Sequence, residues 1–209
     1  MLPPRLVGRG TGVHALTRSE IAACAVVLGM AAMVWLWPSI AFADGVASAV
    51  ACTIVLLAFL FLAGVTPVLT SVDLAVHRLP NAIVLPAFCV GVVLLGTASA
   101  LTRDGGAYFR AWVGCLALGA FYLLLAVVHP GGMGFGDVKL AAVLGLFLGW
   151  QGWGPLLLGS VFAFVLGGLV GVVMLIFRRA DGPTTMAFGP WMLGGAWLGI
   201  ALTPAVMTA

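Results

Sequence analysis

Long stretches without any charged residue constrain this chain more than any other feature of its sequence. A transmembrane helix needs about 20 largely apolar residues. Asp, Glu, Lys and Arg are absent from residues 21–43, 45–72, 79–102, 111–136, 140–177 and 182–209. Only 7% of all residues are charged, whereas an ordinary soluble domain has about a quarter. The sequence therefore predicts an all-α polytopic membrane protein and excludes a soluble enzyme or a disordered chain.

The uncharged segments divide into seven predicted transmembrane helices. Residues 140–177 are long enough for two helices, and the run Gln151-Gly152-Trp153-Gly154-Pro155 can turn the chain between them. The apolar runs are continuous and lack the alternation that is typical of membrane β-barrel strands. The expected helices cover residues 21–41, 46–70, 82–101, 108–128, 135–150, 155–177 and 186–205.

Lys and Arg residues, which favour the cytoplasmic side of a membrane, predict the orientation. With the N-terminus inside, only Arg103 and Arg110 lie on the outer side. The inner side then holds Arg5, Arg9, Arg18, Arg78, Lys139, Arg178 and Arg179. This bias places the C-terminus outside, in a multi-pass protein of the cytoplasmic or inner membrane. Because the basic residues form no cluster, nucleic acid is not an expected partner.

The first apolar segment admits two interpretations. Residues 1–20 are polar and are expected to form a cytoplasmic N-terminal segment. Residues 21–43 end in Ala41-Phe42-Ala43, which is similar to a signal-peptide cleavage site, but signal peptides have an apolar core of only about 7–15 residues. We therefore favour an extra N-terminal transmembrane helix over a signal sequence. In either case residues 46–205 are expected to form a six-helix core.

Glycine and cysteine residues point to packing rather than to metal chemistry. Gly167-Gly168-xx-Gly171 and Gly194-Gly195-xxx-Gly199 place small residues where two helices can approach closely. The four cysteines are isolated within predicted helices and form no Cys-x-x-Cys pair. The sequence therefore predicts neither a zinc site nor a disulfide framework.

Two of the six carboxylates stand apart from the others. Asp73 lies at the inner end of the second predicted helix, and Asp137 lies at the inner start of the fifth. Ionisable groups beside long apolar runs are costly and are by default candidates for function. The remaining carboxylates are interpreted as solvated boundary charges, namely Glu20, Asp44, Asp104 and Asp181.

A pair of close carboxylates has a definite chemistry. The two cannot both stay ionised, so they titrate as one unit. The ionised member can then take a proton from water while the other protonates a peptide carbonyl oxygen. The alternative for each residue is that it only caps a helix or meets Arg78 or Lys139 at the membrane interface.

The sequence around the two aspartates resembles the prepilin peptidase (type IV leader peptidase) family of GxGD-type aspartic proteases. After Asp73 the chain continues to Leu79-Pro80-Asn81, similar to the family's Asp, five residues, then apolar-Pro-Asn motif. The run Gly134-Phe135-Gly136-Asp137-Val138-Lys139 is similar to Gly-x-Gly-Asp-x-Lys. Phe188-Gly189-Pro190 resembles a third, weaker feature of the family.

The resemblance implies a membrane aspartic endopeptidase with Asp73 and Asp137 as its catalytic pair. The supporting motif positions are Gly134, Gly136, Lys139, Leu79, Pro80 and Asn81. Such enzymes cleave the basic leader of prepilin or pseudopilin precursors at the cytoplasmic face, and no cofactor or metal is implied. The chain is more similar to short members that only cleave, because it lacks the Cys-x-x-Cys pair of members that also N-methylate.

Expectations about local structure follow from the same motifs. Pro80 cannot continue a helix, so residues 71–80 are expected to form a partly ordered inner loop. Gly134 and Gly136 lack side chains and would let backbone and substrate approach Asp137. A bulkier residue there would push the two aspartates apart. Lys139 is expected among lipid headgroups, although its motif position also allows it to steady the site electrostatically.

Two functions other than proteolysis are compatible with boundary carboxylates. A small proton-coupled transporter or channel also uses intramembrane Asp residues, but it would place them near the bilayer midplane. A non-catalytic assembly protein with the same fold would not need both Asp73 and Asp137.

Overall fold

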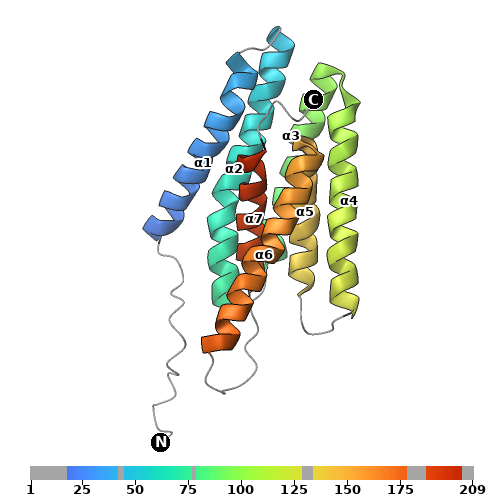
Figure 1. Cartoon of the computed structure of the whole chain (residues 1–209). Helices are drawn as coiled ribbons and strands as arrows, with labels where there is room; N and C mark the ends of the chain where they lie inside the picture. Colours follow the sequence, from blue (N-terminus) through green and yellow to red (C-terminus); the bar gives the residue numbers. More distant parts are fainter. Residues whose placement is uncertain (1–17, 42–44, 77–78, 129–133, 178–186, 204–209) are drawn as a thin grey trace, which may run out of the picture.

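A computed structural model shows that the described part of the chain is helical, as predicted (Figure 1). The structure describes residues 18–41, 45–76, 79–128, 134–177 and 187–203. The helices are α1 (Arg18–Ala41), α2 (Val46–Val76), α3 (Asn81–Thr102), α4 (Gly105–Val128), α5 (Phe135–Gln151), α6 (Trp153–Phe177) and α7 (Gly189–Leu202).

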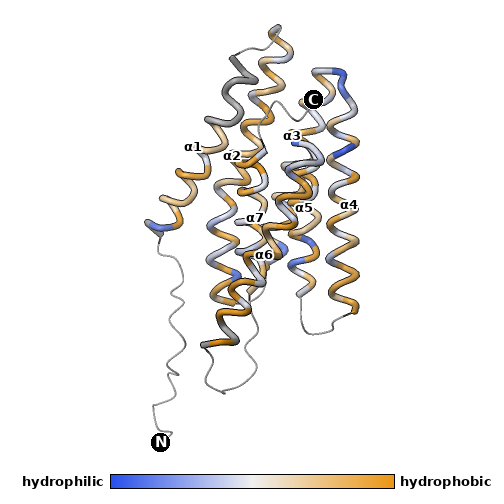
Figure 2. The backbone as a smooth tube through the Cα atoms, viewed as in Figure 1, coloured by the Kyte–Doolittle hydropathy of each residue, from blue (hydrophilic) through white to orange (hydrophobic). Residues whose placement is uncertain are grey.

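The helices have the length and composition of a membrane protein. Four of them are long and apolar enough to cross a membrane, namely α2, α3, α4 and the Trp153–Val173 part of α6. Hydrophilic residues gather toward the two ends of the bundle, and its middle is largely hydrophobic (Figure 2). The expectation of an all-α, multi-pass membrane protein is confirmed.

The helix directions bring distant segments to one end of the bundle. α2 ends where α3, α5 and α7 begin (Figure 1). α7 packs antiparallel to α6 and also contacts α2, where the indole Nε1 of Trp197 donates a hydrogen bond to Thr66 Oγ1 at 3.1 Å. Both side chains are buried, so this bond fixes α7 on α2 inside an otherwise apolar core.

Small residues let two helix pairs approach closely. Between α4 and α5, a Cβ atom added to Gly149 would lie 2.7 Å from the carbonyl oxygen of Arg110. Between α6 and α7, a Cβ atom on Gly199 would lie 2.5 Å from the backbone nitrogen of Gly159. The packing role expected for Gly194-Gly195-xxx-Gly199 therefore holds for Gly199, and Gly195 likewise meets the backbone of α6.

The packing expectation is wrong for two glycines of α6. A Cβ atom on Gly168 or Gly171 would meet nothing within 4 Å. Gly167 does lie in a close contact, although its neighbour is the Phe188 ring rather than a helix backbone. Within this run, only Gly167 lacks room for a side chain, whereas Gly168 and Gly171 face open space.

The turn at residue 152 is confirmed, whereas the loop expected at residues 71–80 is partly wrong. Gly152 separates α5 from α6 with φ at 143°, a conformation that residues with a side chain rarely adopt. α2 continues to Val76, six residues beyond the expected end, so Asp73 lies within the helix. Pro80 restricts only the residue before it, and it serves instead as the N-cap of α3.

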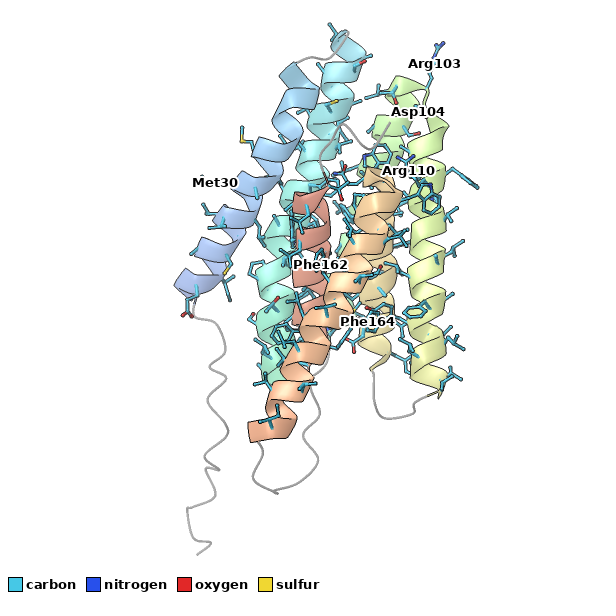
Figure 3. The ribbon with its side chains drawn as sticks, in the orientation of Figure 1. Met30, Arg103, Asp104, Arg110, Phe162 and Phe164 are labelled. Atoms are coloured by element: carbon cyan, nitrogen blue, oxygen red, sulfur yellow. The ribbon has the colours of Figure 1, made fainter. Side chains whose placement is uncertain are left out.

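Several sequence predictions fall on positions outside the described residues. They concern Arg5, Arg9, Arg78, Asp44, Arg178, Arg179, Asp181 and the Phe42-Ala43 part of the cleavage-site pattern. At the end of the bundle away from the end of α2, the described charges are those of Arg103, Asp104 and Arg110. Arg103 and Asp104 lie where α3 joins α4, and Arg110 belongs to α4 (Figure 3). Arg110 donates hydrogen bonds to the carbonyl oxygens of Gly149 at 3.0 Å and Trp150 at 3.1 Å. Its charge therefore lies at the C-terminal end of α5, where a cation is favourable.

Candidate active site

Asp73 is held at the point where α2 meets the start of α7. Its side chain is only 3% exposed. The backbone N–H of Gly189 donates a hydrogen bond to Asp73 Oδ2 at 3.0 Å. Gly189 is the first residue of α7, so its N–H has no partner within its own helix. A carboxylate at this helix N-terminus is also stabilised by the helix dipole.

Asp137 is held by the first turn of its own helix. Gly134 is the N-cap of α5, and its N–H donates to Asp137 Oδ2 at 3.3 Å. In return the backbone N–H of Asp137 donates to the Gly134 carbonyl oxygen at 3.0 Å. The Asp137 side chain is 8% exposed. Both aspartates thus cap helices, as the simpler interpretation expected, but both are also buried.

The two carboxylates lie close enough for their charges to interact. Burial makes the charged form of the Asp137 carboxyl group less favourable, and the charge of Asp73 on another helix adds to this effect. The ends of α2 and α5 that carry them lie at the same end of the bundle (Figure 1). The fold therefore brings together the two carboxylates that the sequence singled out, in surroundings where like charges repel strongly.

The Leu-Pro-Asn segment packs on the Gly-x-Gly-Asp segment. A Cβ atom on Gly136 would lie 2.9 Å from Leu79 Cβ, and Leu79 is buried. A bulkier residue at 136 would therefore displace Leu79 first, whereas the expectation was that it would push the two aspartates apart. Lys139 Nζ donates a hydrogen bond to Asn81 Oδ1 at 2.8 Å. Lys139 is thus bonded to the other motif rather than merely placed toward lipid headgroups.

The neighbourhood of Gly134 differs from that of Gly136. The nearest atoms to a Cβ at 134 are 3.8 Å away, and one of them is Asp137 Oδ2. Its backbone, with φ at −79° and ψ at 149°, is open to any residue. Among the residues that the structure describes, no contact requires glycine at 134, whereas the contact with Leu79 does so at 136.

One polar residue and one contact of the site are not predictable from the sequence motifs. Tyr122 of α4 is 2% exposed and lies near Asp137. Its ring packs against Phe164 and Phe188, with centroids 5.5 and 6.1 Å away. The sequence gives only weak evidence that Tyr122 belongs to the site, because its one distinguishing feature is a hydroxyl group within an apolar helix. The Phe188-Gly189-Pro190 pattern resembles a family feature, but its contact with Asp73 depends on tertiary structure.

Comparisons with known proteins agree with the motifs. The family model described as the type IV leader peptidase family matches residues 54–176, more than half of the chain. The chain is 34% identical over 133 residues to a prepilin leader peptidase/N-methyltransferase of Stutzerimonas stutzeri, covering 63% of this chain and 45% of that protein. It is 30% identical over 138 residues to the protein of that name from Escherichia coli (strain K12), covering 63% and 57%.

These matches establish the family. The chain belongs to the type IV leader peptidase family, and it is a multi-pass membrane protein of that family. It spans about half the length of the curated relatives that it matches. No solved structure matches the fold significantly.

Proposed function

We propose that the protein is an aspartic endopeptidase that removes the leader peptide from prepilin-like or pseudopilin-like precursors. One observation carries the proposal: Asp73 and Asp137, far apart in the chain, are both buried and interact electrostatically at one end of the bundle. The names of the family relatives, which are prepilin leader peptidases, support the choice of substrate.

In the proposed reaction the carboxylate pair activates water. The ionised member removes a proton from water as the water oxygen bonds to the scissile carbonyl carbon, and the protonated member donates its proton to the carbonyl oxygen. The carboxyl group that took the proton from water then passes it to the peptide nitrogen as the C–N bond breaks, and a hydroxyl proton of the tetrahedral intermediate returns to the other carboxylate. The N–H groups of Gly189 and Gly134 would keep the two carboxylates oriented during these steps.

The position of the pair supports a protease over a transporter. Asp73 is three residues from the end of α2, and Asp137 is the third residue of α5. Both are thus near helix ends, where a precursor could present a peptide bond next to its own apolar helix. We place this end at the cytoplasmic face of the inner membrane, because the Lys and Arg residues of the sequence favour that side.

The proposal covers the cleavage reaction and residues 46–205. Residues 21–43 are proposed as an additional helix, of which α1 covers the described part. We propose that the protein cleaves its substrate without N-methylating it, because the given sequence contains no Cys-x-x-Cys pair. Incubation with labelled S-adenosylmethionine and a trimmed pilin should accordingly transfer no label.

Co-expression with a prepilin precursor tests the proposal. The full chain is expressed with a precursor that has a basic leader, a glycine and one apolar helix, and leader removal is followed by mass spectrometry. We expect cleavage by the natural chain and none by Asp73→Asn or Asp137→Asn, with all three proteins at equal levels in the membrane fraction.

Asp104→Asn is the matched control. Asp104 is exposed at the other end of the bundle and accepts a hydrogen bond from Gly106 N–H at 2.9 Å. This variant should cleave at the natural rate. Cleavage at the natural rate by Asp137→Asn would disprove the two-carboxylate mechanism, and no cleavage by the natural chain would disprove the proposed activity.

A further inference from the structure

We propose that Phe188 and Gly189 form a positioning element for the Asp73 carboxylate. Gly167 of α6 has no side chain and so leaves the space that the Phe188 ring fills, which we call the seat of the ring. The inference rests on the proposed function, since it concerns the geometry of one of the two proposed catalytic residues. None of the three residues is proposed to touch the substrate. Their role is to hold Asp73 Oδ2 in one place.

The first step is the contact between Gly189 and Asp73. The N–H of Gly189 donates to Oδ2 at 3.0 Å, and a Cβ atom added to Gly189 would lie 2.6 Å from the same oxygen. The helix end therefore lies so close that Oδ2 accepts the hydrogen bond of Gly189 and would also collide with any side chain at 189. A side chain at 189 would force the carboxylate to rotate away, because Oδ2 is the end of a side chain rather than backbone.

The second step concerns what fixes Gly189. α2 and α7 are joined by two buried bonds, Gly189 to Asp73 and Trp197 to Thr66. These bonds are separated by about two helical turns along each helix. The antiparallel register of α7 on α2 is thus fixed at its middle and at its first residue.

The third step is the anchoring of Phe188, the residue before Gly189. Its carbonyl oxygen accepts hydrogen bonds from Trp191 N–H at 3.1 Å and Met192 N–H at 3.2 Å. Its ring lies over Gly167, where a Cβ atom would be 2.6 Å from the ring carbon Cε2. The ring also packs against Phe164, with centroids 5.7 Å apart. Rings are rigid, so a residue with a side chain at 167 would push Phe188, and with it the start of α7.

The contacts therefore form a connected series from α6 to the carboxylate. Gly167 seats Phe188, Phe188 precedes Gly189, and Gly189 binds Asp73. Gly168 is a matched control position outside this series of contacts, because a Cβ atom there would meet nothing within 4 Å. A role in packing alone predicts lower stability for Gly167→Ala, whereas a positioning role predicts slower chemistry as well.

The test is a kinetic comparison of full-length Gly189→Ala, Gly167→Ala and Gly168→Ala proteins. Cleavage of a purified prepilin precursor in liposomes gives kcat and KM for each protein. We expect kcat to fall by about a hundredfold for the first two, the scale on which a misplacement of about 1 Å acts. KM should stay unchanged, because the substrate contacts remain, and Gly168→Ala should behave as the natural chain.

A second variant keeps the test decisive if Gly189→Ala does not fold. Phe188→Leu removes the ring edge that an alanine at 167 would meet. Gly167→Ala should therefore cost much less kcat in the Phe188→Leu background than alone, which is a non-additive result. Equal losses in both backgrounds would overturn the proposed seat.

The outcomes separate this inference from the proposed function. If the natural chain cleaves the precursor and folded Gly189→Ala keeps the natural kcat, the positioning role is wrong and the protease proposal stands. If the natural chain does not cleave the precursor, both fail. A loss in Gly189→Ala that appears only as a higher KM would also overturn the positioning role.

Discussion

Lys139 donates a hydrogen bond to Asn81 at 2.8 Å, which joins the residue two positions after Asp137 to the first residue of α3. Both side chains are exposed. The bond is therefore an external link between the Gly-x-Gly-Asp and Leu-Pro-Asn motifs, whose internal link is the contact of Gly136 with Leu79. Two independent contacts thus set the position of α5 relative to the segment after α2.

A double-mutant cycle on Lys139 and Asn81 should reveal this coupling. We expect Asn81→Ala and Lys139→Met each to lower the free energy of unfolding by about 0.5–1.5 kcal/mol, the usual net contribution of a hydrogen bond. The double variant should lose less than the sum, because either change alone removes the same bond. Denaturant unfolding in micelles measures the energies, and strictly additive losses would contradict the coupling.

Alanine at 136 should slow prepilin cleavage, whereas alanine at 134 should leave it nearly unchanged. Gly136→Ala places a Cβ atom 2.9 Å from Leu79 Cβ and 3.2 Å from its backbone nitrogen, so the segment before α3 must move. Gly134→Ala meets only atoms at 3.8 Å and keeps the N–H that bonds Asp137. We expect prepilin cleavage to fall at least about tenfold for Gly136→Ala, since small displacements near reacting groups are costly.

Gly134→Ala serves as the matched control for that experiment. Its cleavage rate should stay within about twofold of the natural chain, because its backbone angles suit an L-residue. If both variants lose cleavage equally, glycine is needed at 134 for a reason other than its contacts with the described residues. Equal activity of both would show that the contact with Leu79 does not control the site.

The sequence was sufficient to predict the helices but not all of their ends. Uncharged apolar runs have little freedom in a bilayer, since every backbone group must find a partner within its helix. The start of α2 at Val46 and the ends of α4 at Val128 and α6 at Phe177 agree with the expectation. The predicted end of α2 is wrong because Pro80 was expected to disorder the ten residues up to it, whereas α2 continues to Val76 with Asp73 buried against α7.

The candidate site was predictable where it depends on composition and order along the chain. Asp73 and Asp137 stood out because charges are rare in this sequence. Their partners could not be deduced, because the contact between Gly189 and Asp73 depends on how α7 packs on α2. Tyr122 likewise reaches the site only through the packing of α4 on α5, which small residues at 114, 145 and 149 make close.

Arg103 offers a stabilising substitution away from the candidate site. It is the C-cap of α3 and adopts φ at 56° and ψ at 21°, a left-handed conformation. This conformation costs residues with a side chain about 1–2 kcal/mol, whereas glycine adopts it freely. Arg103→Gly should raise the free energy of unfolding by roughly 1 kcal/mol and leave cleavage unchanged. A lower thermal midpoint than that of the natural chain would contradict this prediction.

Arg110 should affect stability without affecting chemistry. Its guanidinium satisfies two carbonyl oxygens at the C-terminal end of α5, those of Gly149 and Trp150. Arg110→Met keeps much of the side-chain volume but leaves these half-buried acceptors without their donor, at a cost of about 1–3 kcal/mol. Thermal unfolding in micelles should show the loss. Cleavage per folded molecule should be unchanged, because α5 carries Asp137 at its other end. A lower kcat in folded Arg110→Met protein would mean that the position of Asp137 depends on the whole length of α5.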